Sequence, residues 1–114
     1  MTWKLHLDDQ AREEGMEDFR YPPEGDDTYK IATSSAEAID LVSKHGFPTF
    51  LQLDCDLGLL PDGKTPDTAM SFVKWLYEKY PTCEPFWNIH SQNGEAAKNL
   101  QSFLLGWKRS LKGE

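Results

Sequence analysis

The chain has 114 residues, which is the size of one domain, and we expect a single domain over residues 1–114. Its hydrophobic fraction of 39% and aromatic fraction of 12% are enough to fill a core, which excludes a disordered chain. The net charge of −7 repels phosphate backbones and anionic lipids, so the composition argues against an extended nucleic-acid surface and against membrane binding.

The first segments of the chain have the pattern of a strand, a polar loop and a second strand. Residues 3–7 alternate apolar and polar side chains, which is typical of a strand, and two aspartates follow at once. Residues 10–27 are polar and contain glycines and prolines, which indicates a loop with one short helical turn at 11–16. A second short strand is expected over 28–32.

A helix and a third strand come next. Ser34 and Glu37 have the spacing of a capping box, in which the hydroxyl accepts a backbone hydrogen bond and the carboxylate reaches back. The helix that they begin places its apolar side chains on one face and ends at Gly46. Residues 49–53 then predict a buried strand that ends at Asp54.

The second half of the chain repeats this alternation. Residues 58–66 include Pro61, Gly63 and Pro66 and predict a loop, after which Asp67 is expected to cap a second helix. Residues 86–89 predict a fourth strand that ends at His90, and a third helix starts near Asn93. Strands that alternate with helices predict a parallel sheet with right-handed crossovers, and we expect no fifth strand after the last helix.

Three of the predicted strands end in polar groups that are suited to chemistry. The carboxyl ends of parallel strands lie along one edge of a sheet, and ligands bind in the crevice at that edge. We therefore expect one site from three pairs of residues: Asp8 and Asp9, Asp54 and Asp56, and His90 and Ser91.

Four carboxylates at one place repel one another, and a bound cation would offset this repulsion. Carboxylate oxygens are hard ligands, which suit Mg²⁺ or Mn²⁺ better than zinc. A divalent cation of this kind polarises a phosphoryl group or lowers the pKa of a bound water. The sequence therefore predicts metal-dependent phosphate chemistry, with a phosphate-containing small molecule or a nucleic-acid end as substrate.

Three motifs in this order are similar to those of the cyclic-phosphate-processing receiver domains, which are compact relatives of response-regulator receivers in bacterial and phage genomes. The motifs are Leu7-Asp8-Asp9, Asp54-Cys55-Asp56-Leu57-Gly58 and His90-Ser91-Gln92-Asn93. The resemblance covers roughly Lys4 to Leu104. It implies a three-layer α/β fold of the flavodoxin or receiver type. The implied sheet has about four parallel strands in the order 2-1-3-4, with about three helices, and is truncated before strand five.

The resemblance also implies roles for individual residues. Asp8 and Asp9 match the acidic pair that binds Mg²⁺ in receivers, and Asp54 matches the position that accepts a phosphoryl group and completes the metal site. Asp56 and His90 have no role in an ordinary receiver, and they suggest hydrolysis. In this interpretation the catalytic residues are Asp54, Asp56 and His90: Asp56 positions water or a second metal, and His90 either transfers a proton or binds a metal through its neutral imidazole.

Three further residues are expected to bind the phosphate. Ser91 matches the small hydroxyl residue that contacts the phosphoryl group of receivers, and Asn93 would offer the start of the last helix to it. Arg12 is the nearest arginine after the acidic pair, one residue later than the family pattern. The lysine that ends strand five of ordinary receivers has no counterpart here, which argues against phosphorelay signalling.

Several alternatives stay open at this point. An Asp-x-Asp after a buried strand also occurs in haloacid-dehalogenase-like phosphatases, although these need more chain and a distant lysine. The same pocket in a non-enzymatic module would bind a phosphoryl group or metal and regulate a protein partner, and a scaffold without activity would act only through such a partner. Structural interpretations also exist: Asp56 capping a turn, His90 packing at a strand end, and Ser91 and Asn93 capping a helix. His6, within the first strand, is assigned to packing.

The cysteine content and the absence of long apolar runs indicate a location. Cys55 and Cys83 are expected to be free thiols, and the two aspartates beside Cys55 disfavour its thiolate, so we do not expect it to be a nucleophile. No apolar run approaches the roughly 20 residues that cross a bilayer, and the first residues do not form a signal peptide. The expected location is the cytoplasm.

Overall fold

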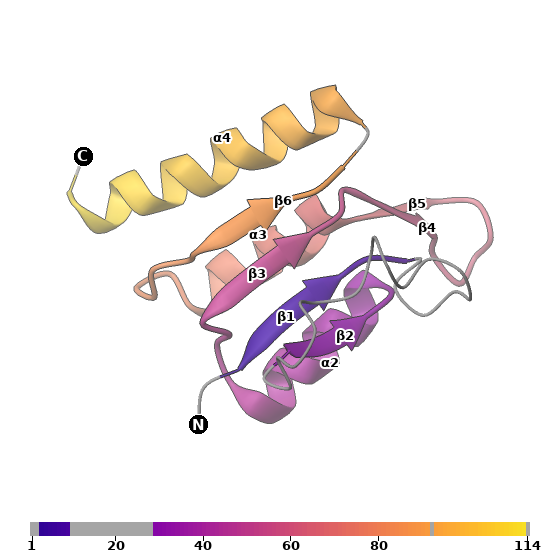
Figure 1. The fold of residues 1–114 in the computed structure, drawn as a ribbon, viewed down its shortest axis with the longest axis horizontal. Helices are drawn as coiled ribbons and strands as arrows, with labels where there is room; N and C mark the ends of the chain where they lie inside the picture. The colour runs from indigo at the N-terminus through magenta and orange to yellow at the C-terminus, as the bar shows by residue number, and fades with distance from the viewer. Residues whose placement is uncertain (1–2, 10–28, 92, 114) are drawn as a thin grey trace.

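The computed structural model describes residues 3–9, 29–91 and 93–113. Among them, four parallel strands form one sheet in the order β2-β1-β3-β6, which confirms the predicted parallel sheet and its order 2-1-3-4 (Figure 1). These strands are β1 (Lys4–Leu7), β2 (Tyr29–Ala32), β3 (Phe50–Leu53) and β6 (Trp87–Ile89). In the described part of the chain, no fifth parallel strand joins the sheet.

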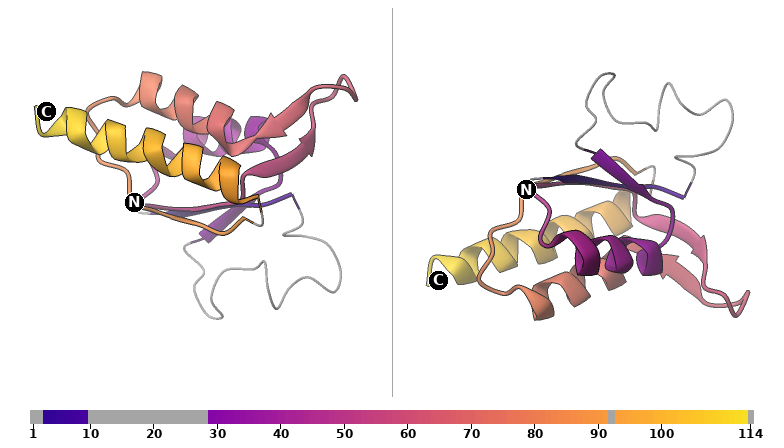
Figure 2. Two further views of the ribbon diagram at one scale, coloured as in Figure 1. Left: turned by 90° about the horizontal axis from the view of Figure 1, so that it is seen from above. Right: turned by 90° about the horizontal axis from the view of Figure 1, so that it is seen from below.

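Three helices pack side by side on one face of this sheet, as the two turned views show (Figure 2). They are α2 (Ser35–His45), α3 (Ala69–Lys79) and α4 (Gly94–Leu111). The described residues place no helix on the opposite face. The described residues therefore form two layers, the sheet and the helices, and the helical turn predicted at 11–16 lies outside them. Among the described helices, none combines the length and apolarity needed to span a membrane.

The start and end of α2 follow from local sequence. The Ser34 hydroxyl accepts from the Glu37 N–H at 3.1 Å, as the predicted capping box requires. The Glu37 carboxylate accepts from the N–H of Thr33 at 2.6 Å, one residue earlier than the usual capping box has it. Gly46 ends the helix with a φ of 86°, a conformation that glycine adopts without strain, and its N–H donates to the Val42 carbonyl at 2.8 Å.

The segment predicted as a loop over 58–66 is instead part of an antiparallel hairpin. The hairpin consists of β4 (Asp56–Leu59) and β5 (Pro66–Thr68). Leu57 is buried in the core and anchors the first strand, while the Asp62 carboxylate accepts from the N–H groups of Lys64 and Thr65 and builds the turn. The prolines and glycine that suggested a loop belong to this turn and to the edges of the hairpin.

Asp67 has a different role from the one predicted. The cap of α3 is Thr68, whose hydroxyl accepts from the Ser71 N–H at 3.3 Å. Asp67 is 3% exposed, and its carboxylate accepts from both the N–H (2.9 Å) and the hydroxyl (2.5 Å) of Ser35. A carboxylate at the start of α2 is stabilised by the free N–H groups there. Asp67 therefore ties the hairpin to the first turn of α2 rather than capping its own helix.

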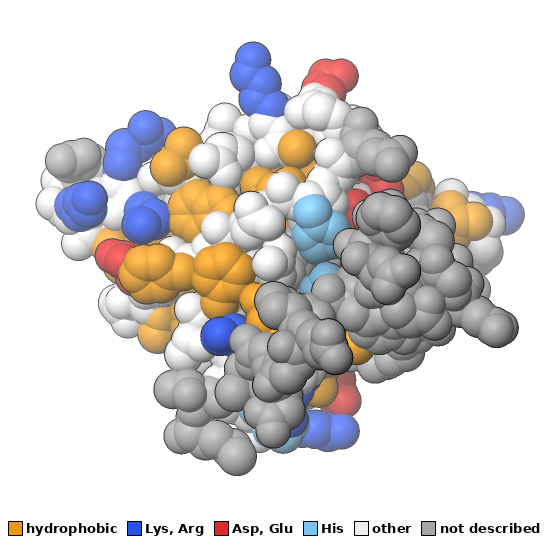
Figure 3. All heavy atoms as spheres, in the orientation of Figure 1, with side chains coloured by type: hydrophobic (Ala, Val, Ile, Leu, Met, Phe, Trp, Pro, Cys, Tyr) orange, Lys and Arg blue, Asp and Glu red, His pale blue; other side chains and the backbone are white. Residues whose placement is uncertain are grey.

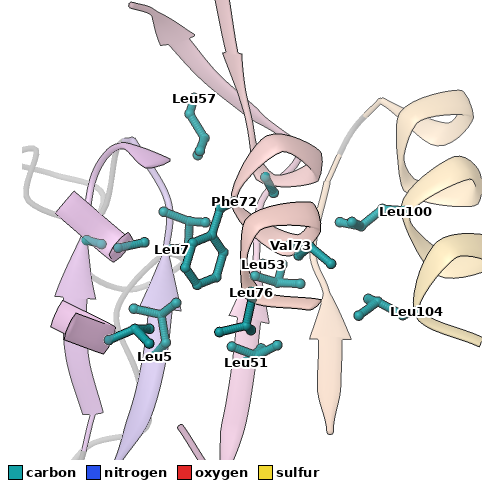
Figure 4. Close-up of a cluster of buried hydrophobic side chains, with 14 of the residues drawn as sticks. Leu5, Leu7, Leu51, Leu53, Leu57, Phe72, Val73, Leu76, Leu100 and Leu104 are labelled. Carbon is teal, nitrogen blue, oxygen red and sulfur yellow. The ribbon is translucent and has the colours of Figure 1, made fainter. Parts of the chain in front are cut away.

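The core lies between the sheet and the three helices (Figure 4). Alternate residues of each strand point to opposite faces, so that the leucines of β1 and β3 point to the helices. The central residues of the core are fully buried: Leu5, Leu7, Leu51, Leu53, Phe72 and Leu76. By the same alternation, His6 in β1 and Gln52 in β3 lie on the helix-free face, and this face carries the site.

Candidate metal and phosphate site

The strands that carry the site are paired in register up to their ends. Leu7 is paired with Leu53, and Leu53 with Ile89. The pairing continues for one more residue, since the N–H of Asp54 donates to the Leu7 carbonyl at 2.9 Å and the N–H of His90 donates to the Leu53 carbonyl at 2.8 Å. Residues in register on neighbouring parallel strands point to the same face. The next rank across the sheet therefore consists of Asp8, Asp54 and His90.

The three predicted metal ligands come together. One carboxylate oxygen from each of Asp8, Asp9 and Asp54 lies within 4.8 Å of the others. Asp8 is fully buried, and Asp54 is 9% exposed. Gly58, in the hairpin, approaches them: it has a φ of 81°, and a Cβ there would lie 3.8 Å from the Asp9 carboxylate. Three carboxylates so close together repel one another, and a divalent cation between them would offset the repulsion.

His90 lies against the most buried of these acids. Its Nε2 is 3.2 Å from Oδ2 of Asp8, and its side chain is 24% exposed. The ring of His6 stacks on the ring of His90, with 5.3 Å between centroids and 18° between planes. Histidine side chains are visible at the surface of this sheet face in Figure 3. The carboxylate and the second ring together fix the orientation of the His90 imidazole.

The other predicted site residues lie at the rim. Asp56 is exposed and accepts from the side-chain amide of Asn93 at 3.3 Å. The amide oxygen of Asn93 accepts from the Ala96 N–H at 3.1 Å and caps α4, and Ser91 accepts from the Asn93 N–H at 3.2 Å. Asp56 is thus held at the start of α4, and it does not join the described groups of potential ligands that lie within 4.8 Å of one another. Arg12 lies outside the described residues.

The model of the cyclic-phosphate processing receiver domain family matches residues 3–106, almost the whole described chain. This chain belongs to that family. The match confirms the resemblance seen in the three motifs, and the sheet order confirms the receiver-like fold. No curated protein and no solved structure matches this receiver domain.

The receiver domain has a buried thiol beside its acidic cluster. Burial raises the pKa of Cys55 above its ordinary value, while a hydrogen bond with Ser91 lowers the pKa to a smaller extent. The negative charges of Asp54 and Asp56 raise it further. A raised pKa means that less thiolate is present at neutral pH than for an ordinary cysteine, which agrees with the sequence-based prediction that Cys55 is not a nucleophile.

We therefore expect Cys55 to react slowly with iodoacetamide at pH 7 to 8 in the folded domain, with a rate that rises as the pH is raised above the ordinary cysteine range. Cys83, which is only half-buried, serves as the internal control and is expected to react first. Peptide mass spectrometry after timed alkylation measures both rates. Alkylation of Cys55 at neutral pH as fast as in urea would contradict the prediction.

His6 is the member of this site that the sequence interpretation assigns to packing. The structure buries it one rank behind Asp8 on the same sheet face, against His90. A signal for this placement exists in the sequence, because alternation along the first strand puts Lys4, His6 and Asp8 on one face. The sequence places His90 at the same edge of the sheet as Asp8, but it does not indicate that the His90 ring stacks on His6.

Proposed function

We propose that this receiver domain hydrolyses cyclic phosphate esters in a metal-dependent reaction at the site that Asp8, Asp9, Asp54 and His90 form. The observation that carries the proposal is the convergence of three carboxylates with an imidazole whose Nε2 lies 3.2 Å from the fully buried Asp8. Membership of a cyclic-phosphate processing family supports the substrate class. The substrate that we propose is a cyclic phosphodiester on a nucleotide or an RNA end.

The donor set fits a hard divalent cation. Asp8, Asp9 and Asp54 offer only oxygen atoms, which are the ligands that Mg²⁺ and Mn²⁺ take in proteins. When bound, such a cation supplies positive charge to the phosphate oxygens and favours the deprotonation of a water molecule. The three aspartates would hold it at the carboxyl edge of the sheet, where ligands of open α/β sheets bind.

The residues of the chain can perform the remaining tasks. In the hydrolysis, water adds to phosphorus, one ester P–O bond of the ring breaks, and the leaving oxygen takes a proton to give a phosphate monoester. His90, whose Nε2 lies 3.2 Å from Asp8, would transfer this proton. Asp56, fixed by Asn93, would orient the attacking water at the rim. Ser91 and the N-terminal amides of α4 would hold the non-bridging oxygens.

Turnover of 2′,3′-cyclic nucleotides, measured with and without Mn²⁺, tests the proposal. We expect formation of the phosphate monoester by the wild-type domain only when the metal is present. Asp54→Asn keeps the shape of the side chain and removes one negative ligand, so it is expected to fall to the background rate. A wild-type rate no higher than that of Asp54→Asn would rule the hydrolase function out.

The position of Asp54 favours a second candidate function. It follows the central strand directly and matches the phosphoryl-accepting position of receivers, so the domain would serve as a phospho-binding module that regulates a protein partner. Incubation with acetyl phosphate and Mg²⁺, followed by intact-mass measurement, separates the two functions. A stable added phosphoryl group on the wild type but not on Asp54→Asn, without cyclic-nucleotide turnover, would favour the module.

A further inference from the structure

We infer that His6, Asp8 and His90 form a second metal site, which binds a transition-metal cation such as Zn²⁺ and shares Asp8 with the carboxylate site. One ligand atom from each of the three residues lies within 4.8 Å of the other two. The inference deepens the proposed function, because it places a regulatory cation at the residue that is proposed to transfer the proton.

The arrangement depends on contacts across the sheet. His6 and Asp8 come from β1 and its end, whereas His90 follows β6, and β3 lies between these two strands. The His90 ring nevertheless lies close enough to stack on His6 and to place Nε2 at 3.2 Å from Asp8. Two imidazoles and one carboxylate from non-adjacent strands thus converge above the middle strand.

Burial adds to this argument. His6 and Asp8 are both buried, and His90 is half-buried. Burial lowers the local dielectric constant, which strengthens the attraction between such ligands and a cation. His6 and Asp8 are two residues apart and lie on the same face of the sheet, so they provide ligands from β1 and its end. His90 provides the third ligand from the end of β6. Zinc takes such ligands at about 2.0–2.2 Å, so binding would require the two stacked imidazole rings to rotate toward a common cation.

The donor atoms distinguish this site from its neighbour. Two imidazole nitrogens and one carboxylate oxygen suit Zn²⁺ and similar transition metals, whereas the all-oxygen set of Asp8, Asp9 and Asp54 suits Mg²⁺. The two sites therefore select different cations although they share one carboxylate. A cation on Nε2 of His90 also excludes a proton from that nitrogen, so Zn²⁺ is expected to inhibit the proposed hydrolysis.

Calorimetric titration of Zn²⁺ into the full chain, in the presence of saturating Mg²⁺, tests the site. We expect one tight Zn²⁺ per chain for the wild type. His6→Phe is expected to weaken this binding at least about 100-fold, since even residues outside the ligand shell change affinity 10–100-fold. His45→Phe, which removes the exposed histidine of α2, is the matched control and is expected to bind as the wild type does.

Two further measurements make the result independent of any one variant. His6→Asn keeps a polar side chain, and thermal unfolding in EDTA checks that both His6 variants fold. Co²⁺ bound to the unmodified chain should show ligand-field bands without thiolate charge-transfer bands, because the proposed site contains no sulfur ligand. Binding at the competing ligands Cys55 or Cys83 would give those charge-transfer bands. A thiolate spectrum, the absence of Zn²⁺ binding, or binding that survives in folded His6 variants would overturn the inference.

The design separates this inference from the proposed function. Asp54→Asn removes a ligand of the carboxylate site only, so it is expected to lose turnover and keep the tight Zn²⁺. Mg²⁺- or Mn²⁺-dependent turnover without a Zn²⁺ site would contradict the inference but support the hydrolase function. If the wild type binds Zn²⁺, His6→Phe does not, and the chain shows no turnover, the inference would be supported and the hydrolase function contradicted.

Discussion

Asp8→Asn is expected to reduce cyclic-nucleotide turnover at least about 100-fold, since ligand-supporting residues alone are worth 10–100-fold. Asp8 is fully buried, its carboxylate belongs to both groups of potential ligands, and it lies 3.2 Å from Nε2 of His90. Asparagine keeps the size of the side chain but removes the negative charge that would bind the proposed cation and that lies against the imidazole. Steady-state rates at saturating Mn²⁺ measure the effect.

Metal binding by the same variant is measured separately from activity. A cation that binds only the folded state stabilises it by about 2.7 kcal/mol when its concentration is 100 times the dissociation constant. Mn²⁺ should therefore raise the unfolding temperature of the wild type and leave that of Asp8→Asn unchanged. Asp62→Asn, in the exposed turn of the hairpin, is the control and should respond as the wild type does. An equal Mn²⁺ response in Asp8→Asn would contradict the assignment of the site.

Phe72→Ala is expected to destabilise the domain by about 3–5 kcal/mol, the usual cost of removing a buried aromatic side chain. Phe72, a residue of α3, is fully buried at the centre of the core (Figure 4). Small domains have about 5–15 kcal/mol of stability in total, so this one change would remove a large share of it. The free energy of unfolding, measured in urea, gives the loss directly.

The matched control for this prediction is Phe86→Ala. Phe86 is the same residue type, but it is 50% exposed beside β6, where it meets the ammonium group of Lys108 at 4.9 Å from the ring centroid. Its removal leaves no cavity in the core, so the unfolding free energy should change by about 1 kcal/mol or less. Equal losses in the two variants would show that the core is not where the structure places it.

The sheet and the acidic site could be predicted because both depend on local patterns. Alternation defined the strands, capping residues such as Ser34 defined the helices, and polar residues marked the strand ends. Parallel pairing then required those ends to meet at one edge. That reasoning needed no knowledge of side-chain direction, and it placed Asp8, Asp9 and Asp54 together correctly.

The features that escaped prediction depend on contacts between distant segments. The hairpin is anchored by Leu57, whose side chain is buried in the core. Asp67 does not cap its own helix because its carboxylate accepts hydrogen bonds from the N–H and hydroxyl groups of Ser35, 32 positions earlier. The His90 ring leans over β3 toward Asp8 and His6, a direction that strand periodicity does not specify. Local sequence patterns predict the order of the strands and helices, whereas contacts between residues distant in sequence form only when the chain folds.

The rank formed by Asp8, Asp54 and His90 has a consequence for how this sequence can diverge. Each of these residues owes its orientation to an even or odd position along its strand, as the leucine or isoleucine before it points to the helices. A single insertion or deletion inside β1, β3 or β6 would invert that parity, burying a reactive group among leucines and turning an aliphatic one outward. A change of two residues would keep the parity, whereas a single extra residue would need a β-bulge to restore it.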